Sequence, residues 1–228
     1  MFDLGQLLGP LISSPYRFRD LWNLLEDQEA LSVHYGKWRS ISTDENGTLE
    51  RPLSDEIKNT LQLEVKDARR HYANMMLVTS YTCLEDIIYS FFKAFFQKQP
   101  LAINEHLRND GREAVIPLRT FLAQSKEEIL SQMIGEASKI ASSGEITSVF
   151  KRIKKHSGYQ IPKDLEAKVS NLRDVRNRIV HEALQLNIGS EEVIDAFDTV
   201  QSVLRHLGLA ATQAGVFVSD PAHLLDQS

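Results

Sequence analysis

The sequence is poor in residues that would stabilise a fold or hold a cofactor independently of a hydrophobic core. Its 228 residues include one cysteine, Cys83, so an internal disulfide and a Cys-x-x-Cys zinc site are both excluded. A reducing, cytoplasmic setting fits this cysteine usage. Cys83 lies in an apolar helical segment, where we expect an inert buried thiol. The seven histidines have no metal-ligand spacing along the chain, so we expect no metal and no other cofactor.

Long uninterrupted hydrophobic runs are also absent. The most apolar segment, residues 75–96, contains Glu85, Asp86 and Lys93, which would be costly at the centre of a bilayer. The N-terminal residues lack the basic start and the apolar stretch of a secretory signal, because Asp3 interrupts them early. We therefore expect no membrane partner and no readable targeting segment.

Several motifs of well-known enzyme classes are missing. The chain contains no Gly-x-Gly-x-x-Gly, no Gly-x4-Gly-Lys-Ser/Thr, no His-Glu-x-x-His and no Gly-x-Ser-x-Gly. Dinucleotide binding, P-loop phosphate binding, zinc proteolysis and serine hydrolysis therefore find no support in the sequence.

What is present is a helical pattern. Apolar residues make up 42% of the chain and recur with a period near 3.6, which predicts an all-α fold. Glycines and prolines predict breaks, including several near the start at Gly5, Gly9, Pro10 and Pro15. Between the breaks we expect helices over residues 54–99 (as one helix or two), about 115–139, 144–156, 162–184 and 190–207. Short connections predict antiparallel neighbours in a bundle.

We expect three parts along the chain. Residues 1–53 hold both tryptophans, Trp22 and Trp38, together with a polar turn at residues 43–47, and are interpreted as a helical N-terminal extension. Residues 54–210 form the bundle, opening at Ser54 with acids in the first turn. Residues 211–228 are a C-terminal tail.

Positive charge is concentrated in one part of this acidic chain. Residues 151–181 contain nine lysines and arginines against three acids, a net charge of +6, so the rest of a chain of net charge −5 carries −11. Such segregation favours a phosphate-bearing partner, although a solvated helix face is the common alternative.

The centre of this region is the stretch RDVRNRIVHE, residues 173–182. On a helical wheel the apolar residues of this segment form one stripe, with Arg176 on its flank and Asn177 and His181 roughly opposite. Asn177 and His181 are four residues apart, so their side chains can meet at one site.

Arg176, Asn177 and His181 resemble the Arg-x4-6-His motif of the HEPN superfamily, with the commonly polar residue after the arginine present as Asn177. The motif lies at the end of the penultimate expected helix, where that family carries it. Residues 80–88 also resemble the first helix of these domains. Many toxin-branch members continue His-x-Tyr, whereas this chain has Ala183 at that position, so no tyrosine role is transferred.

The resemblance implies an antiparallel HEPN-like bundle that cleaves RNA through the ribose 2′-OH without a metal. His181 would transfer a proton, Arg176 would hold the phosphate, and Asn177 would orient either group. Members commonly dimerise so that two motifs share one cleft, and we expect a homodimer. Expected RNA-binding residues are Arg173, Arg178, Lys151, Arg152, Lys154 and Lys155, with Glu85 and Asp86 as supporting residues.

Two alternatives stay open at this point. One is a non-catalytic HEPN-like module that binds RNA, a nucleotide or a partner protein. The other is a plain helical interaction protein in which RDVRNRIVHE is a solvated helix end. For a ribonuclease, a toxin or defence system is the hypothesised setting, with an antitoxin or defence-system protein as partner.

Overall fold

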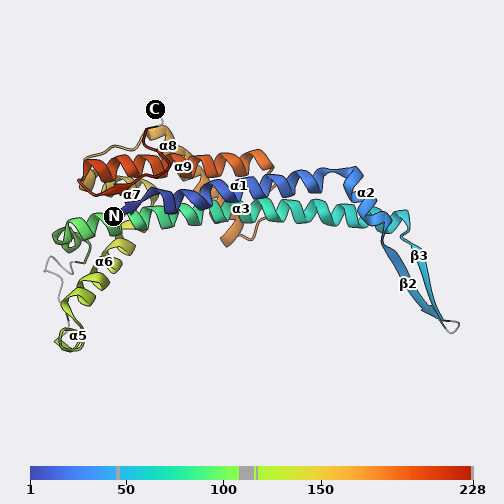
Figure 1. Ribbon diagram of the computed structural model, residues 1–228, viewed down its shortest axis with the longest axis horizontal. Coiled ribbons are helices and arrows are strands. Elements are labelled where there is room, and N and C mark those ends of the chain that lie inside the picture. Colours follow the sequence, from blue (N-terminus) through green and yellow to red (C-terminus); the bar gives the residue numbers. More distant parts are fainter. Residues whose placement is uncertain (45–46, 108–115, 117, 227–228) are drawn as a thin grey trace.

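The computed structural model describes residues 1–44, 47–107, 116 and 118–226 (Figure 1). The described helices are α1 (Leu4–Glu26), α2 (Gln28–Gly36), α3 (Asp55–Lys98), the 3-10 turn η1 (Pro100–Ile103), α4 (Asn104–Leu107), α5 (Leu118–Ala123), α6 (Lys126–Ser142), α7 (Ile146–Ser157), α8 (Lys163–His181) and α9 (Ser190–Gln213). The strands are β1 (Phe2–Asp3), β2 (Arg39–Asp44), β3 (Gly47–Pro52) and β4 (Val218–Ser219). The predicted all-α class is confirmed. Across these described ranges, every helix is too short or too polar to cross a membrane.

Helix α3 is the axis of the molecule. Its 44 residues form one continuous helix, about 66 Å long at 1.5 Å per residue. It begins where the Ser54 hydroxyl accepts a hydrogen bond from the Ile57 amide at 3.3 Å, and it ends just before Pro100. The chain's most apolar segment forms its C-terminal half, which is buried, while its N-terminal part extends beyond α9 in the company of α1 and α2 (Figure 1).

The core surrounds the C-terminal half of α3. Four phenylalanines of this half are almost fully buried, namely Phe91, Phe92, Phe95 and Phe96. Helices α1, α6, α8 and α9 all pack against α3. Burying each large apolar side chain contributes roughly 1.5–3 kcal/mol, so this aromatic cluster is a main source of stability.

The N-terminal residues are packed into the same core. Helix α1 lies against both α3 and α9 and buries Leu4, Leu8, Leu11 and Phe18 (Figure 1). It continues through Pro10 and Pro15, where the sequence predicted breaks. Strand β1 pairs in parallel with β4, which joins the two ends of the described chain.

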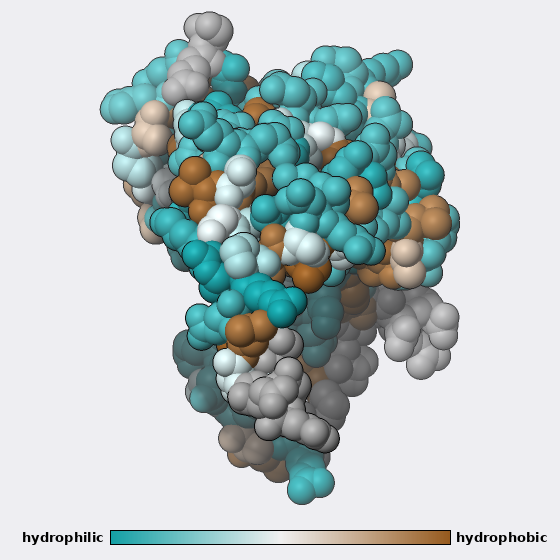
Figure 2. Space-filling view, turned by 90° about the vertical axis from the view of Figure 1, so that its right-hand side faces the viewer, coloured by the Kyte–Doolittle hydropathy of each residue, from teal (hydrophilic) through white to brown (hydrophobic). Residues whose placement is uncertain are grey.

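Strands β2 and β3 form an antiparallel hairpin at the far end of α3, which the helical expectation for residues 1–53 did not include. Arg39 pairs with Pro52 and Asp44 with Gly47. The hairpin lies apart from the bundle, and its apolar residues Ile41 and Leu49 are exposed. Figure 2 looks from this end and shows mainly hydrophilic residues with small, separate hydrophobic patches.

The helix expected over about 115–139 is interrupted, and Ser125 is the reason. The Ser125 hydroxyl accepts a hydrogen bond from the Glu128 amide, and the Glu128 carboxylate accepts one from the Ser125 amide. This reciprocal capping box starts a new helix, α6, separate from α5. Residues 115 and 117 lie outside the described residues.

Candidate active site

The Arg-x4-His stretch forms the C-terminal part of α8. Leu165, Val169 and Leu172 of this helix are buried, and Val175 and Ile179 are partly buried against the same core. This apolar stripe fixes the rotation of the helix, so the polar residues at its end face away from the core.

The structure brings Arg176, Asn177 and His181 together. One guanidinium nitrogen of Arg176, Nη1, donates to Asn177 Oδ1 at 3.2 Å and lies 3.2 Å from His181 Nε2. Arg176 and Asn177 are half-buried and His181 is exposed. The three residues therefore form one cluster with its histidine at the surface.

The contact between Arg176 and His181 fits one tautomer of the imidazole. A guanidinium has only donors, so a hydrogen bond between the two groups uses Nε2 of His181 as the acceptor. In that tautomer the proton is on Nδ1 and the Nε2 lone pair is directed at the cluster. A neutral imidazole in this form can accept a proton from a substrate.

The cluster forms one wall of a cavity of about 330 Å³. Helix α3 contributes Tyr81 and Glu85 to the lining, and the connection between α6 and α7 contributes Ser143 and Gly144. Arg173 completes the basic wall from α8. The cavity thus combines two arginines, a histidine, an amide and a carboxylate.

Tyr81 supports this arrangement, although it was not among the predicted site residues. The residue is 7% exposed, and the Arg176 guanidinium carbon lies 5.8 Å from the centroid of its ring. Burial, reinforced by the negative charge of Glu85, raises the pKa of the Tyr81 hydroxyl, which therefore stays protonated. Tyr81 lies inside the stretch that resembled the family's first helix, but its type alone did not separate it from core aromatics.

The two acids that were expected to support the site, Glu85 and Asp86, differ in their position relative to the cavity. Glu85 lines the cavity, whereas the exposed Asp86, one residue further along α3, is not among its lining residues. Burial is the main cause that raises the pKa of the Cys83 thiol, and the negative charge of Asp86 is the second cause. That thiol therefore stays protonated.

Other basic residues already have partners. The Arg173 guanidinium pairs with Glu145, the N-cap residue of α7. The Arg152 guanidinium donates to three backbone carbonyls at the end of α6, including that of Ser143 at 2.7 Å. Arg152 therefore caps α6, and the adjacent Gly144, at φ +97°, makes the turn that brings the chain back toward α7.

The remaining expected RNA-binding residues lie outside the cavity. Lys155 pairs with Glu105 at 2.7 Å. Lys151, Lys154 and Arg178 are exposed. The structure therefore places Arg173 at the cluster and these lysines on the separate helix α7.

The segment after α8 is held in place by Asn74, which was not among the predicted site residues. Asn74 of α3 is buried, accepts a hydrogen bond from the Leu186 amide at 3.0 Å and donates to the Leu186 carbonyl at 2.9 Å. Ala183 has a left-handed φ of +52°. Together these features end α8 at His181 and bring the chain back along α3.

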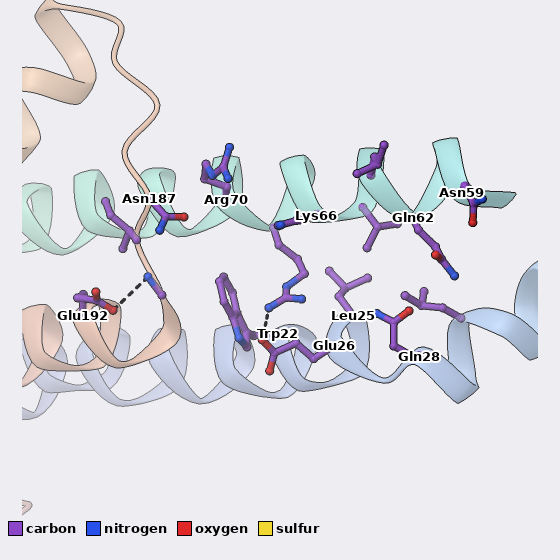
Figure 3. A pocket seen from close by; sticks show the side chains of 16 residues that line it. Trp22, Leu25, Glu26, Gln28, Asn59, Gln62, Lys66, Arg70, Asn187 and Glu192 are labelled. Carbon is purple, nitrogen blue, oxygen red and sulfur yellow. Dashed lines mark hydrogen bonds and ion pairs between the residues drawn. The ribbon is translucent and has the colours of Figure 1, made fainter. Parts of the chain in front are cut away.

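A larger cavity of about 800 Å³ lies between α1 and α3 (Figure 3). In Figure 3, Trp22 and Glu26 project from α1 toward α3. The Arg69 guanidinium lies 4.2 Å from the Trp22 ring centroid and pairs with Glu26. The lining of this larger cavity contains carboxylates and cations but none of the Arg176, Asn177 and His181 side chains. The smaller cavity at Arg176 is the better candidate for chemistry.

Comparisons with known proteins identify the family of this chain. No match was found to any curated protein or to any solved structure. The family described as RiboL-PSP-HEPN matches residues 48–211, which include α3 through most of α9 and all residues of the Arg176 cluster. The chain therefore belongs to the RiboL-PSP-HEPN family of the HEPN superfamily.

Proposed function

We propose that this HEPN-family protein is a metal-independent endoribonuclease that cleaves RNA through the ribose 2′-OH. The observation that carries the proposal is the contact between Arg176 and His181 at the mouth of a cavity lined by polar and basic side chains. This contact places a proton acceptor beside a permanent positive charge, which is the pair that such cleavage requires.

The chemical step follows from that pair. A phosphate of the RNA replaces His181 as the partner of the Arg176 guanidinium, whose fork can hold two phosphate oxygens. Nε2 of His181 then takes the proton of the 2′-OH, and the 2′-oxygen attacks phosphorus. The bond from phosphorus to the 5′-oxygen breaks, and that oxygen receives a proton from an acid. The products are a 2′,3′-cyclic phosphate and a 5′-hydroxyl.

Asn177 and Tyr81 have positioning roles in this proposal. Asn177 holds one side of the Arg176 guanidinium through its Oδ1, and the Tyr81 ring lies beneath it. Both contacts restrict the guanidinium before RNA arrives, which lowers the entropy lost on binding phosphate.

One histidine serves as base, so the acid must come from a second group. A homodimer that brings two Arg176 clusters together would supply a second, protonated His181 for the leaving oxygen. The exposure of His181 favours such a shared cleft, because a second protomer can reach it. The exposed Lys151 and Lys154 would attract the RNA backbone.

The first experiment is incubation of the untagged protein with end-labelled tRNA and with a single-stranded RNA, in EDTA. His181→Ala and Arg176→Ala are compared with His71→Ala and Arg17→Ala, which remove an exposed histidine of α3 and an exposed arginine of α1. We expect the parent and the two control variants to cleave, leaving 2′,3′-cyclic ends, and the two site variants to lose at least about 10²-fold in rate. A substrate with 2′-deoxy sugars should resist cleavage.

Equal cleavage by all five proteins would identify a contaminant and overturn the proposal. RNA binding without cleavage, weakened by Arg176→Ala alone, would instead favour the non-catalytic binding module.

The oligomeric state, measured by light scattering, tests the shared cleft: a strict monomer with full activity would contradict it. A cytoplasmic toxin or defence role with a protein inhibitor is part of the proposal, and growth arrest on expression, absent in His181→Ala, is its test.

A further inference from the structure

A second histidine cluster lies away from the Arg176 cavity. His106 and Glu105 come from α4, and His156 comes from the last turn of α7. The two Nε2 atoms of His106 and His156 lie 3.0 Å apart, and one ligand atom from each of the three residues falls within 4.8 Å of the others. Side chains distant in sequence thus converge on one point.

The surroundings hold these rings in place. The ring of His156 lies 4.9 Å from that of Phe95, and the ring of His106 lies 5.3 Å from that of Phe96, measured between centroids. Both histidines are half-buried. Burial is the main cause that lowers the pKa of each imidazole, so both rings favour the neutral form. Neutral imidazole is the form that binds metals.

The distances suit a small divalent ion. Zinc bonds imidazole nitrogen at about 2.0–2.1 Å, so two imidazoles in a tetrahedral shell have nitrogens about 3.3 Å apart. The observed 3.0 Å therefore needs an opening of only about 0.3 Å. In the absence of an ion the same two nitrogens share one proton as a hydrogen bond.

The carboxylate of Glu105 completes the cluster. One of its oxygens, Oε2, accepts a hydrogen bond from Lys155 Nζ at 2.7 Å. That hydrogen bond and the charge of Lys155 lower the pKa of Glu105, so the carboxylate is ionised. Oε1 remains available as a third ligand, while Lys155 orients the carboxylate from the other side.

We propose that Glu105, His106 and His156 form a binding site for a divalent transition metal ion of the Zn²⁺ type, with water as the fourth ligand. Two imidazoles and one carboxylate are a donor set that zinc uses in proteins. The ion would fasten α4 to α7 and to the aromatic core of α3. The proposal concerns the stability of that corner and does not depend on the proposed ribonuclease activity.

The test uses untagged full-length protein stripped with EDTA and then titrated with Co²⁺ and Zn²⁺. Tetrahedral Co²⁺ absorbs strongly in the visible range, and we expect one equivalent to develop that band and one equivalent of Zn²⁺ to remove it. Zinc should also raise the melting temperature of the parent. His106→Gln and His156→Gln should lose at least about 100-fold in affinity, and Glu105→Gln at least about tenfold.

Glu105 is partly exposed, so its replacement tests the site in a variant that keeps the aromatic packing intact. His71→Gln is the matched control, because it removes an exposed histidine from α3 and should bind as the parent does. Absence of the Co²⁺ band in the folded parent would overturn the proposal, and so would equal affinity in the Glu105→Gln and His71→Gln variants. RNA cleavage in EDTA is measured separately, so failure of one proposal leaves the other tested on its own.

Discussion

Helix α7 and the end of helix α8 are both rich in basic residues, yet their charges are used differently. On α7, the Arg152 guanidinium donates hydrogen bonds to carbonyls at the end of α6, and Lys155 pairs with Glu105. On α8, Arg176 contacts the side chains of Asn177 and His181 and the Tyr81 ring, and it lines a cavity. A basic stretch in a sequence therefore contains both cations that hold the fold and cations that are available to a ligand.

The largest effect is expected from Arg176→Lys. Lysine keeps the charge but lacks the planar fork, so it cannot hold two phosphate oxygens and the contact to Asn177 at the same time. We expect a loss of about 10²- to 10³-fold in single-turnover cleavage, as when one preorganised donor is removed from a charged transition state. A rate within threefold of the parent would mean that Arg176 acts only as a surface charge.

Arg152→Ala should affect stability instead of chemistry. The change removes the donors to three carbonyls at the end of α6, and a hydrogen bond from a charged group contributes roughly 1.5–3 kcal/mol. Urea unfolding should show a loss of about that size, with cleavage retained well below the midpoint. Lys151→Ala, one residue away and exposed, is the control and should leave unfolding unchanged. If Arg152→Ala instead abolished cleavage without changing stability, Arg152 would belong to the RNA site. The contrast between α7 and the end of α8 would then not hold.

Smaller effects are expected from the exposed lysines of α7. If Lys151 and Lys154 meet phosphates, replacing each by alanine should reduce the slope of log affinity against log salt by about 0.7 for single-stranded RNA. Lys155→Ala should reduce it less, because that lysine is already paired. Fluorescence anisotropy on a His181→Ala background measures binding without cleavage. If neither the Lys151 nor the Lys154 variant changed the salt slope, the RNA would have to bind on another face of the protein.

The smallest effect is expected at Glu145, which joins the two regions by pairing with Arg173. Glu145→Gln removes a negative charge near the cavity and frees Arg173 for RNA. Because Glu145 is largely exposed, the gain should be modest, a tightening of RNA binding by less than about fivefold. Weaker binding would show that the Glu145 pair positions Arg173 productively.

Short-range features were predictable from the sequence. The Ser54 cap and the acids after it set the start of α3, and the apolar stripe of α8 set which residues face outward. Arg176, Asn177 and His181 lie within six residues on one helix, so helical geometry alone brings them near one another. The match of residues 48–211 to the family agrees with the resemblance drawn from that motif.

Long-range features were not predictable. Arg152 caps a helix that ends about ten residues earlier, and nothing in its own neighbourhood indicates that partner. His106 and His156 are 50 residues apart and meet only because α4 and α7 both pack at the end of α3. The hairpin was missed because its apolar residues, Ile41 and Leu49, stay exposed, so its strands carry little burial pattern.

The packing of α1 on α9 has a consequence for the order in which the protein is made. The apolar stripe of α1 leaves the ribosome before α9, which follows only after α3 through α8 have been synthesised. At 5–20 residues per second this delay is roughly 10–40 s. During that interval the stripe of Leu4, Leu8, Leu11 and Phe18 lacks one of its two partners, and α3 lacks the helix that braces it. Translation speed thus sets the time for which this apolar stripe is without its second partner.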